Sequence, residues 1–339
     1  MAYPMRHDSI LKAPDVGLPN SARHRLTGDW SVGGGDYATL LNPAAAHRGV
    51  GVAPGSFGEL LQGALSNELE HFLVTLPIKC YSLAEFVPIE TRSDVEVIPH
   101  SKTKSLALAQ KYLQRFGIQS GGKLFIKSDL PAGKGLASST ADLVATARAL
   151  ASHFQRPLSQ ELLLDLLRDV EPSDGIMYPT HTVFYYRKVR LGALLADLPP
   201  LTILAIDEGG TIDTIEYNQN LPAFSNEEKK EYGRCLDKMV QAFQAQDLMA
   251  LGEVSTRSAT LNQQRCPKRF YAGVLEICQQ GRGLGVVVTH SGPCIGILLA
   301  QDDRDFDLKK QDIWNQLAQL SPHRMVYETI TAHRPHRDT

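Results

Sequence analysis

Residues 131–140 read Pro131-Ala132-Gly133-Lys134-Gly135-Leu136-Ala137-Ser138-Ser139-Thr140, and they form the most informative segment of the chain. An alternating, strand-like segment precedes them at 123–128, and apolar residues at helical spacing follow, up to residue 154. Glycines and short side chains let backbone N–H groups approach an anion closely, and a helix N-terminus adds partial positive charge and unpaired donors. The arrangement favours a phosphate-binding loop over a tight turn without a ligand.

A Walker A loop has Ser or Thr directly after its lysine, but Gly135 and Leu136 follow Lys134 in this chain. This difference excludes a P-loop NTPase. The pattern Pro-x-x-x-Gly-Leu-x-Ser-Ser resembles the second signature of the GHMP kinases, the superfamily of galactokinase, homoserine kinase, mevalonate kinase and phosphomevalonate kinase. The resemblance implies a loop that surrounds the phosphates of ATP. The implied ATP-binding residues are Pro131, Gly133, Lys134, Gly135, Leu136, Ala137, Ser138, Ser139 and Thr140.

The composition is that of a globular enzyme. The chain has 339 residues, enough for two ordinary domains with a substantial core, and 43% of them are hydrophobic and 21% charged. A formal net charge of −2 gives no reason to expect a nucleic acid as partner, so small molecules are the expected partners. The oligomeric state is left open, with a homodimer as one alternative.

Cysteine usage and the N-terminus indicate the compartment. The five cysteines contain no C-x-x-C pair, and an odd number does not suit a disulfide framework. The first residues carry several charges and no apolar stretch of signal-peptide type, and no later segment approaches the length of a membrane span. These features predict a protein of the reducing cytoplasm that is neither secreted nor inserted into a membrane.

Strand and helix patterns mix irregularly along the chain, without the regular alternation of βαβ units, and this indicates an α+β fold. Residues 1–48, rich in Pro, Gly, His and Arg, are predicted to be an N-terminal extension of unassigned role. The predicted strands are 51–53, 72–76, 81–87, 94–98, 123–128, 180–189, 201–206, 284–289, 294–300 and 324–331. The predicted helices are 103–116, 143–154, 160–170, 225–246, 247–263, 268–280 and 309–320. A junction near 190–200 predicts an N-terminal, ATP-binding domain at 49–195 and a C-terminal domain at 196–332.

Two further segments occur in the order that the GHMP kinases require. Ala53-Pro54-Gly55-Ser56-Phe57-Gly58-Glu59-Leu60 resembles their N-terminal signature Pro-Gly-x-x-x-Gly-Glu/Asp, which lines the acceptor and nucleotide cleft. Residues 286–296 resemble their C-terminal signature Gly-x-x-x-Ser-Gly-x-Gly-Pro, which closes over the phosphate-transfer site with Ser291 and Gly292. The resemblance implies a two-domain GHMP kinase fold with ATP between the domains. Its N-terminal module is similar to ribosomal protein S5 domain 2, and its C-terminal module is ferredoxin-like.

Two positions depart from these signatures. Ser56 stands where a Lys is common, two residues after the proline of the first motif, so no lysine-based role is expected at that position. The C-terminal motif also lacks its second glycine before the proline.

Two carboxylates, Glu171 and Asp174, stand at the end of a predicted helix. Phosphoryl transfer needs a cation that bridges phosphate oxygens and a group that orients the attacking hydroxyl. Mg²⁺ takes few protein ligands beside phosphate and water oxygens, so Ser139 and one carboxylate suffice. We therefore assign Ser139 and Glu171 to Mg²⁺, and Asp174 to the acceptor hydroxyl as a base or an orienting group, so that Asp174 and Ser139 are the candidate catalytic residues. A solvated helix cap is the alternative.

Within the superfamily, the segment Pro-Gly-Ser-Phe-Gly-Glu-Leu-Leu-Gln-Gly at 54–63 is similar to the L-threonine kinases linked to propanediol utilisation and cobalamin synthesis. Residues 171–175 and 206–214, the latter ending in Asp213-Thr214, are similar to the same subgroup. The resemblance implies transfer of the γ-phosphate of ATP to the side-chain hydroxyl of L-threonine. The implied acceptor site consists of Ser56, Gly58, Glu59, Gln62 and Asp174.

Other acceptors and a protein without turnover are the alternatives. L-Homoserine, L-serine or a natural-product precursor could accept the phosphate by the same chemistry. The N-terminal extension weakens the link to the cobalamin pathway. A GHMP-fold sensor that binds nucleotide and ligand without turnover belongs to another class. The retained Ser138, Ser139, Glu171 and Asp174 argue against the sensor.

A free amino acid carries a carboxylate and an ammonium, so its pocket needs an Arg or backbone donors and an acid. Asp207 and Glu208 after a predicted strand are candidates for the acid. Arg257 and Arg265, on or near a predicted helix, are candidates for binding the carboxylate, and a surface residue is the favoured interpretation of each. Two residues that flank the C-terminal turn are interpreted as packing residues: His290 and Cys294.

Overall fold

The computed structural model describes residues 48–66, 71–211 and 222–330. All of the described residues belong to one compact unit. The predicted extension 1–48 therefore lies outside the described residues except for Arg48, and so do Asp213 and Thr214. The predicted domain boundary near residue 195 stays a prediction.

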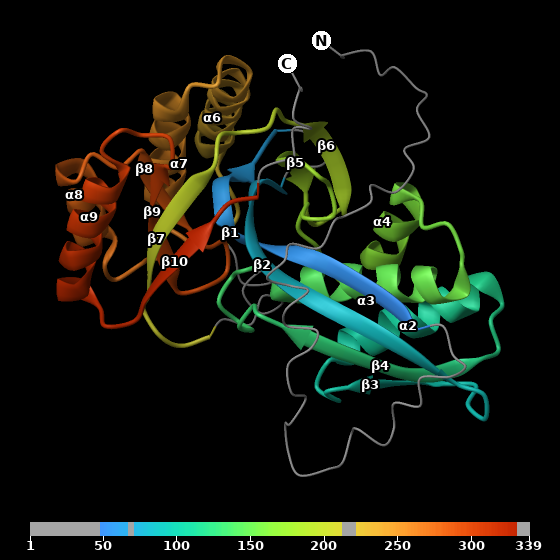
Figure 1. Cartoon of the computed structure of the whole chain (residues 1–339). Helices are drawn as coiled ribbons and strands as arrows, with labels where there is room; N and C mark the ends of the chain where they lie inside the picture. The colour runs from blue at the N-terminus through green and yellow to red at the C-terminus, as the bar shows by residue number, and fades with distance from the viewer. Residues whose placement is uncertain (1–47, 67–70, 212–221, 331–339) are drawn as a thin grey trace, which may run out of the picture. The chain divides into compact units, whose positions relative to one another are not determined.

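One mixed sheet runs through the described residues, in the strand order β10-β7-β9-β8-β1-β2-β4-β3, with the hairpin β5–β6 attached to β2 (Figure 1). Neighbouring strands pair antiparallel except β3 and β4, which are parallel. The strands are β1 Gly49–Ala64, β2 His71–Ile89, β3 Val95–Ile98, β4 Gly121–Ser128, β5 Thr182–Tyr185, β6 Arg190–Leu194, β7 Leu201–Asp207, β8 Gly285–Val288, β9 Cys294–Ala300 and β10 Arg324–Glu328.

The helices pack against this sheet in two groups (Figure 1). Helix α3 contacts β1 and β2 and is flanked by α2 and α4, whereas α7 contacts β1 and β8 and is flanked by α6; α8 and α9 pack on β9. The helices are α2 Thr103–Phe116, α3 Ser138–Phe154, α4 Gln160–Arg168, α6 Asn226–Ala245, α7 Leu248–Asn262, α8 Tyr271–Gln280 and α9 Phe306–Leu320. Among the residues that the structure describes, no helix has both the length and the apolar character of a membrane span.

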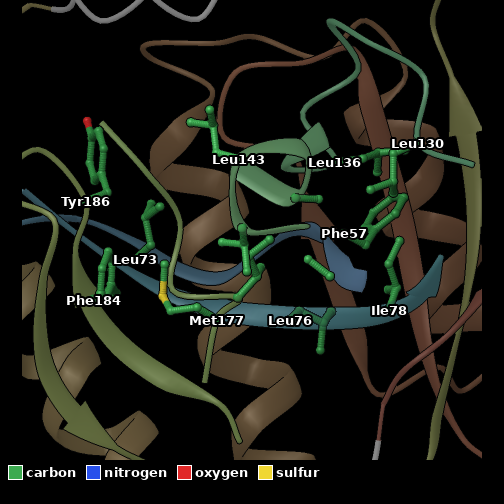
Figure 2. Packing of buried hydrophobic residues seen from close by; sticks show 14 of the residues in the cluster. Phe57, Leu73, Leu76, Ile78, Leu130, Leu136, Leu143, Met177, Phe184 and Tyr186 are labelled. Atoms are coloured by element: carbon green, nitrogen blue, oxygen red, sulfur yellow. The ribbon is translucent and has the colours of Figure 1, made fainter. Parts of the chain in front are cut away.

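Buried side chains attach the loop between β4 and α3 to the sheet. Leu130 and Leu136 belong to the same hydrophobic cluster as Phe57 of β1 (Figure 2). A Cβ atom at Gly55 would lie 2.4 Å from a methyl group of Leu130 and 2.7 Å from the Leu136 carbonyl oxygen. Strand β1 and this loop therefore approach too closely for a side chain at position 55, which explains the glycine of the first motif.

Strands β1 and β2 are longer than the predicted strands. The predicted strand at 51–53 continues through the first motif to Ala64, and β2 unites the predicted strands at 72–76 and 81–87. The register of β1 against β2 shifts between Pro54 and Gly55 and again on both sides of Glu59. Such bulges interrupt the two-residue alternation of side chains without ending the strand, so the alternation alone underestimates its length.

The segment predicted as a single strand at 180–189 is instead part of a hairpin, so that prediction is wrong in its second half. Strand β5 ends at Tyr185, and β6 begins at Arg190 after a turn in which Val189 has a φ of 44°. A β-branched residue rarely adopts a positive φ, so the sequence gives no turn signal there. The other predicted elements overlap observed ones, and the α+β class is confirmed.

Candidate active site

The loop between β4 and α3 has the backbone of an anion-binding loop. Gly133 and Gly135 have φ values of 72° and 73°, and Ala137, the N-cap residue of α3, has a φ of 56°. Helix α3 begins at Ser138, and Ala137 has no polar side chain that could accept from the first N–H groups of the helix. Helix N-termini with free N–H groups attract phosphate.

The turn between β8 and β9 packs directly on this loop. A Cβ atom at Gly292 would lie 2.2 Å from the Lys134 carbonyl oxygen, and one at Gly135 would lie 2.6 Å from the Thr289 Cβ. Ser291, beside Gly292, is buried. The structure thus brings the second and third predicted motifs into contact.

We expect Gly292→Ala to raise the KM for ATP at least about tenfold. The added methyl group overlaps the Lys134 carbonyl oxygen and must displace the phosphate-binding loop, and small misplacements of binding groups are costly in catalysis. The matched control is Gly233→Ala in α6, where the nearest atom among the described residues, a methyl carbon of Leu65, lies 4.0 Å from the added Cβ. Steady-state kinetics over ATP concentration measure both variants. An unchanged KM in Gly292→Ala would contradict the contact between turn and loop.

The first motif reaches the same place from β1. Glu59 pairs with Val288 of β8, and a Cβ atom at Gly58 would lie 2.1 Å from the Val288 carbonyl oxygen. Gly58 also has a φ of 50°, which favours glycine. The Ser56 hydroxyl donates to the Gly58 carbonyl at 2.8 Å and accepts from the Leu76 N–H at 3.2 Å. Ser56 therefore holds the bulge of β1 against β2, and Glu59 is the residue of this motif that presents a carboxylate.

Glu171, Ser139 and Lys104 form a polar cluster at the start of α3. The Ser139 hydroxyl donates to one carboxylate oxygen of Glu171, and Lys104 Nζ lies 2.5 Å from the other. The Glu171 side chain is only 6% exposed, whereas that of Lys104 is 39% exposed. Next to this cluster, the Asp174 N–H donates to Thr140 Oγ1 at 3.2 Å. The structure therefore places Ser139, Glu171 and Asp174 together, and adds Lys104, which no sequence pattern predicts.

Asp174 and Glu59 carry carboxyl groups whose ionisation is coupled. Desolvation by the surrounding protein, and then the Glu171 carboxylate, raise the pKa of Asp174 to about 7. Burial, and then the Asp174 carboxylate, raise the pKa of Glu59 well above its usual range. Within the described residues, Glu59 Oε2 has no hydrogen-bond partner. A carboxylate with a pKa near 7 is suited to accept a proton at neutral pH.

Known domains match both halves of the described chain. Residues 103–181 match the GHMP kinases N terminal domain, and residues 239–311 match the GHMP kinases C terminal domain. The chain belongs to the GHMP kinase superfamily. This confirms the predicted family and the predicted enzyme class, a phosphotransferase with an alcohol group as acceptor.

This GHMP kinase is similar to two L-threonine kinases. That of Citrobacter freundii is 28% identical over 77% of this chain and 90% of its own length, and that of Salmonella typhimurium is 26% identical over 78% and 85%. The fold is shared with homoserine kinase from Cytophaga hutchinsonii, at a TM-score of 0.65 and 13% identity over 84% of this chain and 95% of the other. Mevalonate kinase from Methanococcus jannaschii gives a TM-score of 0.65 at 14% identity over 86% and 100%. The predicted GHMP kinase fold is confirmed.

The residues predicted to hold a metal fit Mg²⁺ by their donor set. Ser139 and Glu171 offer a hydroxyl and a carboxylate oxygen, the type of ligand that Mg²⁺ prefers. In the part of the chain that the structure describes, no group of three His, Cys, Asp or Glu side chains is arranged to hold a metal. The phosphates of ATP and water would therefore supply most ligands, which is usual for Mg²⁺. Lys104 balances the charge of Glu171 in this structure.

Contacts between loops are made by Lys134, Asp207 and Glu208. Lys134 Nζ lies 2.6 Å from Asp207 Oδ2, and this ion pair joins the loop between β4 and α3 to the end of β7. Glu208 accepts hydrogen bonds of 2.9 and 2.7 Å from two backbone N–H groups just before α8. Both acids thus have partners within the protein, whereas Glu59 has an oxygen without one among the described residues.

The interpretation of Arg265 as a surface residue is wrong. Its side chain is 5% exposed and pairs with Glu228 at 2.7 Å. Arg257 is 47% exposed and pairs with Glu231 at 2.5 Å, as expected for a surface residue. Both arginines lie in or just after α7, and the sequence pattern does not show that α6 covers one of them more fully than the other.

His290 and Gln62 connect the turn after β8 to β1. His290 Nδ1 lies 2.5 Å from Gln62 Oε1, and Nδ1 carries the proton because the amide oxygen can only accept. Burial, followed by nearby cationic groups, lowers the pKa of His290 to about 3, so its ring is neutral. The ring also lies edge-on to Tyr186, with centroids 5.0 Å apart. Cys294 is a buried thiol whose pKa burial raises to about 12, as suits a packing residue.

Proposed function

We propose that this GHMP kinase transfers the γ-phosphate of ATP to the side-chain hydroxyl of a hydroxy amino acid, with L-threonine as the first acceptor and O-phospho-L-threonine as product. The observation that carries the proposal is the similarity to two L-threonine kinases, which extends over 77% and 78% of this chain. The grouping of Ser139, Glu171 and Asp174 beside a phosphate-binding loop supports it.

In this proposal, the loop 131–140 and the free N–H groups at the start of α3 bind the phosphates of ATP. Ser291 and Gly292 hold that loop from the turn after β8. Ser139 and Glu171 hold Mg²⁺, which when bound neutralises phosphate charge and orients the transferring group. Positioning and electrostatics are the main requirements of phosphoryl transfer, and these residues provide both.

Asp174 faces the acceptor hydroxyl in this proposal. The hydroxyl oxygen forms a bond to the γ-phosphorus, the bond from that phosphorus to the bridging oxygen breaks, and ADP leaves with the electron pair. The proton of the hydroxyl passes to the Asp174 carboxylate, whose pKa of about 7 permits this near neutral pH. Gly58, Glu59 and Gln62 form the acceptor side of the site, and Ser56 positions their strand.

Other acceptors compete with L-threonine. The homoserine kinase from Cytophaga hutchinsonii shares the fold at 13% identity, a likeness that does not extend to the substrate. L-Homoserine and L-serine are therefore included in the test. A sensor without turnover would have no use for the grouping of Ser139, Glu171 and Asp174 beside this loop.

The test is ADP release with Mg-ATP across L-threonine, L-serine, L-homoserine and no acceptor. We expect kcat/KM for L-threonine to exceed that for the other acceptors at least about tenfold, since the extra methyl group or methylene changes the fit of a small pocket by about 1–3 kcal/mol. Selective turnover of another amino acid would support kinase activity and overturn L-threonine as the acceptor. Tight ATP binding with no turnover of any acceptor would contradict the proposal.

We also propose the cytoplasm as the compartment, since the five cysteines are free thiols. Cobalamin synthesis is proposed as the pathway on the subgroup resemblance alone. ATP and the acceptor amino acid are the proposed partners.

A further inference from the structure

Arg265 is a buried cation with an incomplete set of partners. It follows α7, and its side chain is 5% exposed. Nη2 donates to Glu228 Oε1 at 2.7 Å, but Nε and Nη1 have no hydrogen-bond partner among the described residues. Burying charged N–H donors without acceptors is costly, so a buried guanidinium in this state needs an acceptor from elsewhere.

The protein holds this guanidinium in a fixed orientation. Its carbon lies 3.7 Å from the ring centroid of Phe224, which matches the stacking of a planar cation on an aromatic face. Its partner Glu228 is itself fixed, because Glu228 and Ser225 form the capping box of α6 with bonds of 2.7 and 3.2 Å. A rigid, pre-oriented arginine is typical of a recognition site rather than of a surface ion pair.

Two amide groups in the same pocket also lack acceptors. Gln62, Asn262, Phe224, Arg265 and His290 are among the residues that line it. Gln62 and Asn262 are each 3% exposed, and neither Gln62 Nε2 nor Asn262 Nδ2 has a hydrogen-bond partner among the described residues. One cation and two amide N–H₂ groups therefore line a single pocket, and they complement a small anion with several acceptor oxygens.

This pocket adjoins the phosphate-transfer site. Gln62 lies three residues after Glu59 on β1. Its side-chain oxygen is hydrogen-bonded to His290, which directly precedes Ser291 and Gly292. The His290 ring lies against Tyr186, whose carbonyl accepts from the N–H of the residue before Asp174 at 3.2 Å. The lining of this pocket is therefore linked through His290 and Tyr186 to the segment that carries Asp174.

We infer that Arg265, with the amides of Gln62 and Asn262, forms the carboxylate-binding subsite for the acceptor. The inference rests on the proposed function and deepens it: the kinase selects α-amino acids over amino alcohols that carry the same hydroxyl. Phe224 and Glu228 are positioning residues for the guanidinium.

The experiment compares L-threonine with (R)-1-amino-2-propanol, which keeps the hydroxyl and the amine but lacks the carboxylate. In the parent, we expect kcat/KM for L-threonine to be at least about 100-fold higher, because a buried site built for an anion rejects the analogue that lacks it. Arg265→Met is expected to lose about 100-fold on L-threonine and to change less than about threefold on the amino alcohol. The matched control is Arg257→Met, which replaces the exposed arginine within α7 and should change neither kcat/KM value.

A binding titration separates this inference from the proposed function. The parent should bind L-threonine, L-serine and L-homoserine by calorimetry in the presence of a non-hydrolysable ATP analogue, and Arg265→Met should lose that binding while retaining the nucleotide. Binding without phosphate transfer would overturn the proposed function and leave the subsite supported. Binding of none of these amino acids by the parent would overturn the subsite.

Arg265→Lys guards against a folding defect. It keeps the charge next to Glu228 and loses the planar set of donors, so we expect a parent-like unfolding temperature with a preference for L-threonine reduced at least about tenfold. If Arg265→Met and Arg265→Lys both lose activity equally on L-threonine and on the amino alcohol, the role of Arg265 is structural and the inference is wrong. Unchanged kinetics in both variants would overturn it as well.

Discussion

Replacing Asp174 by Asn is expected to lower kcat about 1000-fold while the affinity for ATP stays within about threefold of the parent. The substitution keeps the size of the side chain and removes the oxygen that accepts the proton, and a positioned general base contributes about 10²- to 10⁴-fold. ATP affinity is retained because Asp174 contacts the start of α3 through its backbone N–H, which donates to Thr140. ADP release and nucleotide titration measure the two effects. A variant as active as the parent would remove Asp174 from the mechanism.

The same substitution is expected to stabilise the fold in a way that depends on pH. Desolvation, and then Glu171, raise the pKa of Asp174 from its usual value of 3.8 to about 7. The folded parent binds this proton more tightly than the unfolded chain, so the contribution of the protonated Asp174 to the stability of the parent is complete below about pH 4 and is lost as the pH rises through about 7. Asp174→Asn should therefore unfold at a higher temperature than the parent at pH 8, and the difference should shrink toward pH 5. An advantage that does not vary with pH would contradict the raised pKa.

The second large effect is expected at Glu171. Glu171→Gln should lower kcat about 100-fold and raise the Mg²⁺ concentration for half-maximal activity at least about tenfold. A neutral amide is a weaker ligand for Mg²⁺ than a carboxylate, and Ser139 and Lys104 no longer contact a negatively charged group. Activity measured over free Mg²⁺ at fixed ATP tests this expectation.

Asp142 provides a matched control for Glu171. Its carboxylate is also buried, and it also pairs with a serine hydroxyl and a lysine, Ser82 and Lys102, each at 2.5 Å. Asp142→Asn should therefore lower the unfolding temperature by a similar amount, since each substitution removes the charge of a buried, paired carboxylate. The Mg²⁺ requirement should stay at the parent value. Equal shifts of that requirement in both variants would show that Glu171 has no specific role at the metal.

The sequence predicted best the parts of the site that depend on residues close together in the chain. Gly133, Gly135 and Ala137 have positive φ values, which is the local backbone that glycines and small residues in this loop predict. Ser139, Glu171 and Asp174 were assigned from the needs of phosphoryl transfer, and they lie together as that assignment requires, although their roles stay predictions. Periodicity likewise predicted most of the elements that carry these residues.

Long-range packing explains what the sequence did not predict. Arg265 owes its burial to Glu228 and Phe224, about forty residues earlier in the chain, and no local pattern distinguishes it from exposed Arg257. Lys104 reaches Glu171 from the first turn of α2, 67 residues earlier in the chain. The bulges that extend β1 through the first motif result from its pairing with β2 and β8, which the alternation of side chains along one strand does not reveal.

The most direct test of the account is identification of the product formed from Mg-ATP and L-threonine. With ATP labelled in the γ-phosphate, we expect the label to appear in a single amino acid product, with the phosphate ester on the side-chain oxygen as located by phosphorus NMR and mass spectrometry. The amount of this product should equal the amount of ADP released. Label found only in inorganic phosphate, with the L-threonine unchanged, would contradict the central claim that this GHMP kinase phosphorylates L-threonine.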